Sequence, residues 1–169
     1  LVREAVEADS NLLLVLLQRT AENKFLRLNV DGPSELGAGF PTSRADLFKY
    51  RAIVLGSIEA SAFSQEQLRM LADFVNVRGG GMLFLGGRSA FGEGGYAGTP
   101  VADVLPFYIS GDAVADSLTP FLELQVRVTP AGLQHPVTQH AVASRSGERP
   151  ASPIVTVPVT SVNKVARLK

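Results

Sequence analysis

Three short runs that are almost wholly apolar are the feature of this sequence that most constrains its fold. They lie at residues 12–17, 51–56 and 81–86, with polar or helical segments between them. Runs of this length suit strands, because a helix that crosses a membrane needs about 20 apolar residues. Strands that are buried on both faces of a parallel sheet have such continuous apolar sequences. We therefore predict three strands of one parallel sheet and no segment that spans a membrane.

One well-formed helix is predicted between the second and third runs. Ser64 and Gln67 have the spacing of a capping box, in which each side chain bonds the backbone N–H of the other residue. The apolar residues that follow recur at helical spacing: Leu68, Leu71, Ala72 and Val75. Gly79 ends the pattern. Strand, helix and strand in this order form a right-handed unit with parallel strands, so we expect an α/β fold with a doubly wound sheet.

Weaker patterns surround this unit. We expect a helix up to residue 9, an extended segment at 24–30, a turn at 31–33, short helices at 45–50 and after Thr99, and strands at 107–109, 121–128 and 155–165. The polar, proline-containing residues 144–153 are predicted to form a mobile loop. At about 100–200 residues per domain, a chain of 169 residues is expected to form a single domain, 1–169. Because the chain starts at Leu1 rather than Met, we expect it to be excised from a longer protein.

Composition excludes several classes of site. Basic and acidic residues number 16 each, so the formal net charge is zero and nothing in the sequence suggests binding to nucleic acid. Cysteine is absent, which excludes disulfides, zinc–thiolate sites and thiol nucleophiles. The two histidines, His135 and His140, have few carboxylates near them. We therefore predict neither a metal site nor a cofactor.

Five segments together resemble a known group of domains. They are Leu47–Gly56, Gln67–Val75, Arg78–Gly87, Gly94–Tyr96 and Thr99–Pro106. Their pattern resembles the class I glutamine amidotransferase-like domains of large bacterial membrane proteins, many of which also contain a von Willebrand factor A domain. The resemblance spans roughly residues 1–143 and, more loosely, 156–169.

The resemblance implies a fold and a setting. The fold would be a flavodoxin-like three-layer sandwich, with a mostly parallel sheet, helices on both faces and extra strands in the C-terminal third. The parent would be a membrane-associated bacterial protein, and the resemblance favours the periplasm over the cytoplasm for this domain. Its partners would be other domains of the same parent chain or another protein.

The catalytic residues of that family do not carry over to this sequence. A working class I amidotransferase has a cysteine on the turn after its central strand, and a His and a Glu two residues apart in a later segment. Here the turn after Leu85 comprises residues 86–89, and His135 is followed by Val137 where a Glu is needed. This chain is therefore not a cysteine glutaminase, and we expect a non-catalytic interaction or ligand-sensing domain.

The glycine-rich loop at residues 86–95 is the first candidate site. It follows a strand, and open α/β sheets bind ligands at the carboxyl ends of their strands. Consecutive backbone N–H groups of this loop, among them those of Gly86, Gly87 and Ser89, are suited to an anion, with the Arg88 side chain assisting. The loop has neither the P-loop pattern nor the dinucleotide-binding pattern. The alternative is that its glycines only permit a tight turn.

Ser89 is also a weak candidate nucleophile, with His135 as its base. Asp103 or Asp112 would then orient the histidine, as in a catalytic triad. The G-x-S-x-G motif is absent, because Phe91 occupies the last position. If the chain is an enzyme, this pair implies a hydrolase of non-cysteine chemistry that uses the crevice at the carboxyl ends of the strands. The alternative is that Ser89 only caps a turn.

Glu59 and a group of aromatic residues complete the candidates. Glu59 follows the run at 51–56 and is expected to lie near Arg88, either as a buried ion pair or lining an open cleft that binds a polar ligand. The aromatic residues stand in loops or at the ends of elements, where we expect some to be core and others to form an interface. They are Phe40, Phe48, Tyr50, Phe63, Phe91 and Tyr96.

Overall fold

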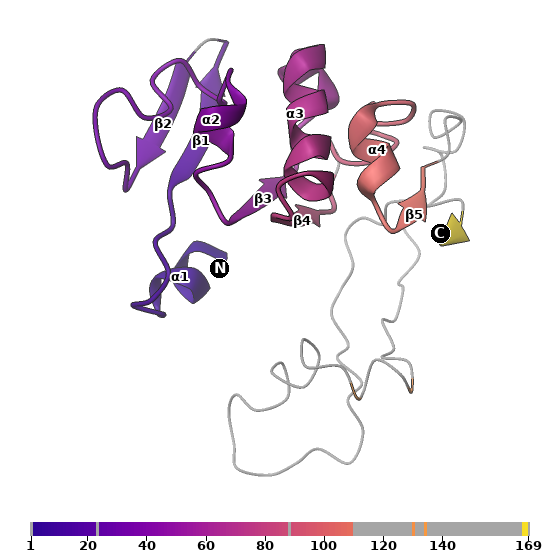
Figure 1. Cartoon of the computed structure of the whole chain (residues 1–169), viewed down its shortest axis with the longest axis horizontal. Helices are drawn as coiled ribbons and strands as arrows, with labels where there is room; N and C mark the ends of the chain where they lie inside the picture. Colours follow the sequence, from indigo (N-terminus) through magenta and orange to yellow (C-terminus); the bar gives the residue numbers. More distant parts are fainter. Residues whose placement is uncertain are drawn as a thin grey trace. The chain divides into compact units, whose positions relative to one another are not determined.

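The computed structural model describes residues 2–22, 24–87, 89–109, 130, 134 and 167–168. The chain divides into two compact units, Leu1–Ala113 with Asn163–Lys169, and Val114–Val162. The helices and strands of the described residues belong to the first unit (Figure 1). In chain order they are α1 (Val2–Glu7), β1 (Leu16–Ala21), β2 (Lys24–Leu28), α2 (Arg44–Leu47), β3 (Ala52–Gly56), the 3-10 turn η1 (Ala60–Ala62), α3 (Gln65–Asn76), β4 (Gly81–Leu85), α4 (Pro100–Val104), β5 (Phe107–Tyr108) and β6 (Arg167–Leu168).

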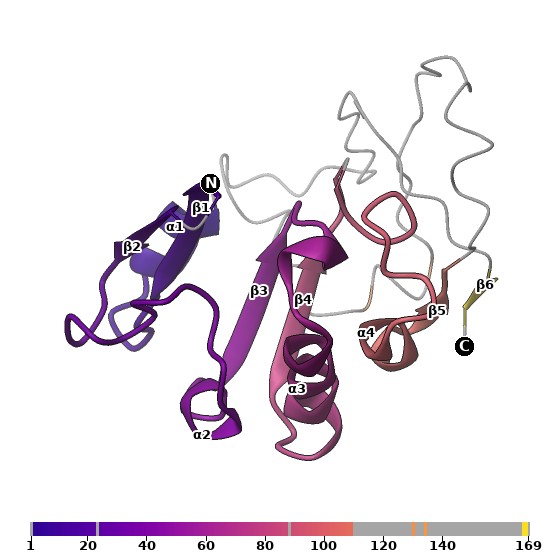
Figure 2. The ribbon, with the colours of Figure 1, turned by 90° about the horizontal axis from the view of Figure 1, so that it is seen from above.

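The predicted strand–helix–strand unit is present. Strands β3 and β4 pair in parallel, with Ala52 opposite Gly81 and Gly56 opposite Leu85, and α3 connects them. Figure 2 shows α3 lying along one face of this pair. The described residues thus form a mixed α/β structure with a small parallel sheet. None of their helices has the length and apolar character needed to cross a membrane.

The capping box of α3 is confirmed atom by atom. The Ser64 hydroxyl accepts from the Gln67 backbone N–H at 3.1 Å, and the Gln67 side-chain oxygen accepts from the Ser64 backbone N–H at 2.9 Å. The Gln67 side-chain amide also donates to the backbone carbonyls of Phe40 (3.0 Å) and Pro41 (3.3 Å). One side chain therefore fixes the start of α3 and the end of the loop that precedes α2.

Loss of this cap gives the first testable expectation. Ser64→Ala removes the acceptor for the Gln67 N–H and is expected to lower the free energy of unfolding by about 1 kcal/mol. Urea unfolding followed by circular dichroism measures the change. Ser61→Ala is the control, because Ser61 is an exposed serine of η1 outside the capping box. Equal stabilities of the two variants would contradict the role assigned to Ser64.

The core lies between α3, α4 and one face of the parallel pair. Its main cluster contains Leu55, Leu68, Leu71, Tyr96 and Val101, with Ile53, Met82 and Phe84 packed against it from the strands. A second cluster of Leu47, Met70 and Phe74 fixes α2 against α3. Alternate residues of β3 and β4 thus point into one apolar layer, as the two-residue period of a strand requires.

The other face of the parallel pair corrects the expectation that these strands are buried on both sides. Val54 is 42% exposed and Leu83 is 52% exposed, although both are in the middle of their strands. The physical reason is that α3 and α4 pack against the face that carries Leu55 and Phe84. Among the described residues the three-layer arrangement is therefore not complete.

The first apolar run also differs from its prediction. Leu12 and Leu13 are 55% and 72% exposed and precede the strand, which begins at Leu16. Strand β1 pairs antiparallel with β2 in a local hairpin and does not join the parallel sheet. Its C-terminal residues are polar, and pairing with the next segment of chain closes only a short loop, which costs little entropy. The prediction of a third parallel strand at residues 12–17 is therefore wrong.

Several other predictions can be placed. The extended segment at 24–30 contains β2, the short helix at 45–50 overlaps α2, and the strand at 107–109 contains β5. Strand β5 pairs antiparallel with β6. The predicted strands at 121–128 and 155–165 and the predicted loop at 144–153 lie outside the described residues.

Candidate functional site

The loops that follow β3 and β4 meet at the carboxyl end of the parallel pair. Parallel strands end at the same edge of a sheet, so residues 57–59 and 86–95 are brought together by topology. The Ser89 hydroxyl donates to a Glu59 carboxylate oxygen at 2.7 Å. The Ala60 backbone N–H donates to the Gly94 carbonyl at 2.8 Å. A side-chain bond and a backbone bond therefore join the two loops.

Tyr96 supports this junction from the core of the fold. Its ring is fully buried and packs edge-on against Phe84 with ring centroids 4.8 Å apart. Its hydroxyl donates to the backbone carbonyl of Ile58 at 2.9 Å. Burial, together with the negative charge of Glu59, raises the pKa of the Tyr96 hydroxyl. Tyr96 therefore remains a protonated donor at neutral pH and holds the loop that carries Glu59.

Close packing requires a glycine at position 94 of the candidate loop and leaves little space beside a second glycine, Gly87. A Cβ at Gly94 would lie 2.4 Å from the Ser89 carbonyl oxygen, and a Cβ at Gly87 would lie 2.7 Å from the Ser57 hydroxyl oxygen. Gly94 meets backbone atoms, which cannot rotate out of the way. These contacts favour the structural alternative for the glycine-rich loop, in which glycine allows close approach of two chain segments.

The backbone of the same two loops contains two non-glycine residues with positive φ. Ser57 has φ 38° and Phe91 has φ 53°. L-residues rarely adopt this region, and such conformations persist only where the surrounding structure enforces them. The junction of the loops is therefore held in one defined conformation by its packing.

The exposure of Glu59 corrects the prediction that this residue forms a buried ion pair. Glu59 is exposed and not buried. The hydrogen bond from Ser89, followed by a bond from its own backbone, lowers the pKa of the Glu59 carboxyl below its usual value. Glu59 is thus an ionised acceptor at neutral pH. A carboxylate with a lowered pKa is a weak base, because general-base catalysis works best with a pKa near the working pH.

The remaining predicted residues separate into two groups. Gly86 and Gly87 follow β4 directly, and Asp103 lies on the exposed side of α4. Arg88, Asp112, His135 and His140 lie outside the described residues, so the Glu59–Arg88 and Ser89–His135 pairs stay predictions. Of the proposed site residues, the structure brings Glu59 and Ser89 into direct contact.

The loop aromatics pack inside the fold and do not form an exposed patch. Phe63, Phe91 and Tyr96 are buried, and Phe40, Phe48 and Tyr50 are partly buried against the core clusters. Phe40 meets Phe63 with ring centroids 5.0 Å apart, and Phe91 meets Phe107 at 5.1 Å. The expectation that some of these residues belong to the core is thus confirmed for the three buried rings, and the expectation of an interface stays a prediction.

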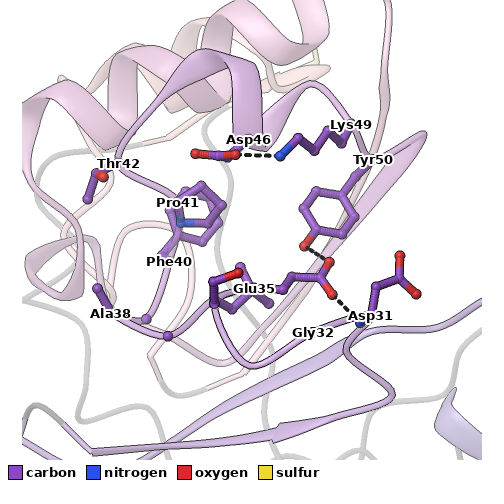
Figure 3. A pocket seen from close by; sticks show the side chains of 14 residues that line it. Asp31, Gly32, Glu35, Ala38, Phe40, Pro41, Thr42, Asp46, Lys49 and Tyr50 are labelled. Atoms are coloured by element: carbon purple, nitrogen blue, oxygen red, sulfur yellow. Dashed lines mark hydrogen bonds and ion pairs between the residues drawn. The ribbon is translucent and has the colours of Figure 1, made fainter.

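Sequence reasoning missed a second feature, a cavity in the loop between β2 and α2. The cavity has a volume of about 540 Å³ and is lined by residues between Asp31 and Tyr50 (Figure 3). The sequence pattern predicts only a turn at residues 31–33. The sequence does contain a signal for a binding loop here, because Gly32, Gly37 and Gly39 occur close together in a segment that also contains acidic and aromatic residues.

Comparison of the chain with known protein families, with curated proteins and with solved structures finds no significant match.

Proposed function

We propose that this chain is a non-catalytic, glutamine amidotransferase-like domain that serves as an interaction or ligand-sensing module of a bacterial envelope protein. Its fold would be completed as a flavodoxin-like three-layer sandwich, with the β3–α3–β4 unit as its centre. Its partners would be other domains of the same parent chain, and the periplasm is the favoured compartment. The observation that carries the proposal is the hydrogen bond that the Ser89 hydroxyl, in the loop after β4, donates to the Glu59 carboxylate.

Ser89 occupies the turn where this architecture would place a nucleophile. Its hydroxyl proton is donated to Glu59 at 2.7 Å. A serine becomes nucleophilic when an adjacent base takes this proton, and the base needs a pKa near the working pH. The pKa of Glu59 is shifted in the opposite direction, below its usual value. The contact therefore suits a loop-fixing hydrogen bond better than an activated nucleophile.

The chain has no cysteine to replace Ser89 in this role. A thiol is the nucleophile of the class I amidotransferases that the sequence resembles. The close packing at Gly87 and Gly94 further favours a loop that serves as scaffold. These observations together support a domain that acts through binding.

One observation favours the alternative, a hydrolase of non-cysteine chemistry that uses the same crevice. Backbone strain collects at functional sites, and two of the four described non-glycine residues with positive φ, Ser57 and Phe91, lie in the two loops that meet at the carboxyl ends of β3 and β4. In this alternative Ser89 or a water molecule would be the nucleophile.

An activity test separates the two functions. The purified chain is assayed for ammonia release from glutamine and for hydrolysis of a p-nitrophenyl acetate substrate, beside Ser89→Ala and the control Ser61→Ala. We expect no glutaminase activity, and ester hydrolysis that is the same in all three proteins. A turnover that falls about a hundredfold or more in Ser89→Ala alone, the usual scale for losing a catalytic group, would establish the hydrolase.

A further inference from the structure

The cavity between β2 and α2 shares no lining residue with the loops at the carboxyl ends of the parallel strands, 57–59 and 86–95. Its volume of about 540 Å³ falls within the range of small-molecule sites, roughly 300–1,000 Å³. Its walls come from one continuous stretch of chain, the loop after β2 together with α2 and the residues that follow it. Figure 3 shows the side chains that line it, with Lys49 bonded to Asp46 and Tyr50 bonded to Glu35.

Glu35 is the fixed polar group of this cavity. One of its carboxylate oxygens accepts from the Tyr50 hydroxyl at 2.6 Å, and the other accepts from the Asp31 backbone N–H at 2.6 Å. Its backbone carbonyl accepts from the Arg27 guanidinium at 2.8 Å, and Arg27 also donates to the Pro33 carbonyl. Glu35 is therefore held in place by side-chain and backbone contacts before any ligand arrives.

The charges around the cavity are predominantly negative. Carboxylates of Asp31, Glu35 and Asp46 line it, against the ammonium of Lys49 in the wall and the guanidinium of Arg27, which is bonded to the Glu35 carbonyl. Lys49 bonds Asp46 at 2.6 Å, and both of these side chains are more than half exposed. The hydrogen bond from Tyr50 lowers the pKa of Glu35, so this carboxyl stays ionised at neutral pH. A cation in the cavity would therefore meet carboxylates that are already charged.

Aromatic rings supply the apolar part of the wall. Phe40 and Tyr50 both line the cavity, and Phe40 is fixed by its edge-on contact with Phe63. The Tyr50 hydroxyl is committed to Glu35 as a donor, and burial raises its pKa, so Tyr50 stays neutral. Aromatic faces beside carboxylates favour an ammonium group on a short hydrocarbon chain, which gains cation–π and ionic contacts together.

We propose that this cavity binds a small organic amine, a primary ammonium carried on a short aliphatic chain. The ammonium would lie among the carboxylates of Asp31 and Glu35, and the aliphatic part would lie against Phe40 and Tyr50. The proposal goes beyond the proposed function, because it concerns a different site and does not depend on Ser89.

The test uses the full chain with 1,4-diaminobutane as the probe and 1,4-butanediol as its neutral analogue. Backbone amide shifts of Gly32, Gly37 and Gly39 report occupancy of the cavity, and calorimetry gives the affinity. We expect the diamine to shift these amides and the diol to bind roughly tenfold more weakly, because it lacks ionic and cation–π contacts. Added salt should weaken diamine binding, since the carboxylates are exposed to solvent.

Two charge variants with opposite expected effects sharpen the test. Asp31→Asn removes a lining carboxylate and should weaken diamine binding about twofold to fivefold. Lys49→Met removes the competing ammonium, keeps the aliphatic stem, and should tighten binding by a similar factor. Glu22→Gln, an equal charge change at an exposed residue of the β1–β2 turn that does not line the cavity, should leave the affinity unchanged.

Three outcomes would overturn the proposal. They are equal binding of diol and diamine, weaker diamine binding in Lys49→Met, and the absence of amide shifts in the loop. Weaker binding in Lys49→Met together with binding of inorganic phosphate would assign the cavity to an anion instead. Ser89→Ala should bind the diamine like the parent chain, so failure here is distinguishable from failure of the proposed function.

Discussion

Phe74→Ala is expected to lower the free energy of unfolding by about 3–5 kcal/mol. Phe74 is fully buried and belongs to the cluster with Leu47 and Met70 that fixes α2 against α3. Phe48 packs on its ring with centroids 6.2 Å apart. Truncation leaves a cavity that these neighbours cannot fill without moving the helices. Because domains are stable by only about 5–15 kcal/mol, this is a large part of the total free energy of unfolding.

Urea unfolding followed by circular dichroism, extrapolated linearly to water, measures this loss. Val77→Ala is the matched control, because Val77 immediately follows the same helix but is 67% exposed. It should change stability by no more than about 0.5 kcal/mol. A Phe74→Ala protein as stable as Val77→Ala would mean that the α2–α3 cluster does not support the fold.

Gly94→Ala is expected to cost about 1–3 kcal/mol, the usual range for forcing extra atoms into a packed site. The new methyl group would lie 2.4 Å from the Ser89 carbonyl oxygen and 3.0 Å from the Cα of Ala90. These are backbone atoms, so the clash is relieved only by moving residues 89–90 away from Gly94. That movement should also break the hydrogen bond from Ser89 to Glu59.

Two measurements check this expectation. Gly32→Ala is the control for stability, because a Cβ at Gly32 meets no atom within 4 Å, and it should be neutral or stabilising by up to about 1 kcal/mol. Carboxyl-detected NMR titration of Glu59 checks the site itself. Its pKa should rise toward the ordinary glutamate value, about 4.3, when the Ser89 bond is lost. An unchanged Glu59 titration in a folded Gly94→Ala protein would show that the two loops are not coupled through Gly94.

The helix cap, the apolar face of α3 and the two neighbouring strands could be predicted from the sequence, because each depends on residues that are close together in the chain. The capping box at Ser64 and Gln67, the apolar stripe of α3 and the two strands beside it each depend on residues within a few positions. The helix predicted after Thr99 is α4, although the Thr99 hydroxyl donates to the Tyr96 carbonyl and does not cap the helix. Such a bond depends on where the preceding loop runs, which spacing alone does not give.

The long-range part of the fold was less predictable. A continuous apolar run does not reveal which strand it pairs with, so residues 12–17 were assigned to a parallel sheet although β1 forms a hairpin with β2. The same limit explains Val54 and Leu83, whose exposure depends on which face the helices cover. Burial of a run is decided by elements far away in the sequence.

The candidate site was predictable in location and not in contacts. Parallel strands place Glu59 and Ser89 at one edge of the sheet, so their proximity follows from topology. Their hydrogen bond depends on the path of the glycine-rich loop and on the support from Tyr96. The cavity near Glu35 was missed because a turn pattern at residues 31–33 says nothing about the space enclosed by the rest of the loop.

The double role of Gln67 has a thermodynamic consequence. Its side chain bonds Ser64 at the start of α3 and the carbonyls of Phe40 and Pro41, two residues that line the cavity. A ligand that binds only when this loop is in place therefore also favours the folded start of α3. Linkage is reciprocal, so a change that frays the start of α3 must weaken that ligand by the same coupling free energy. Binding of a ligand in the cavity and folding of the first turn of α3 are thus thermodynamically coupled.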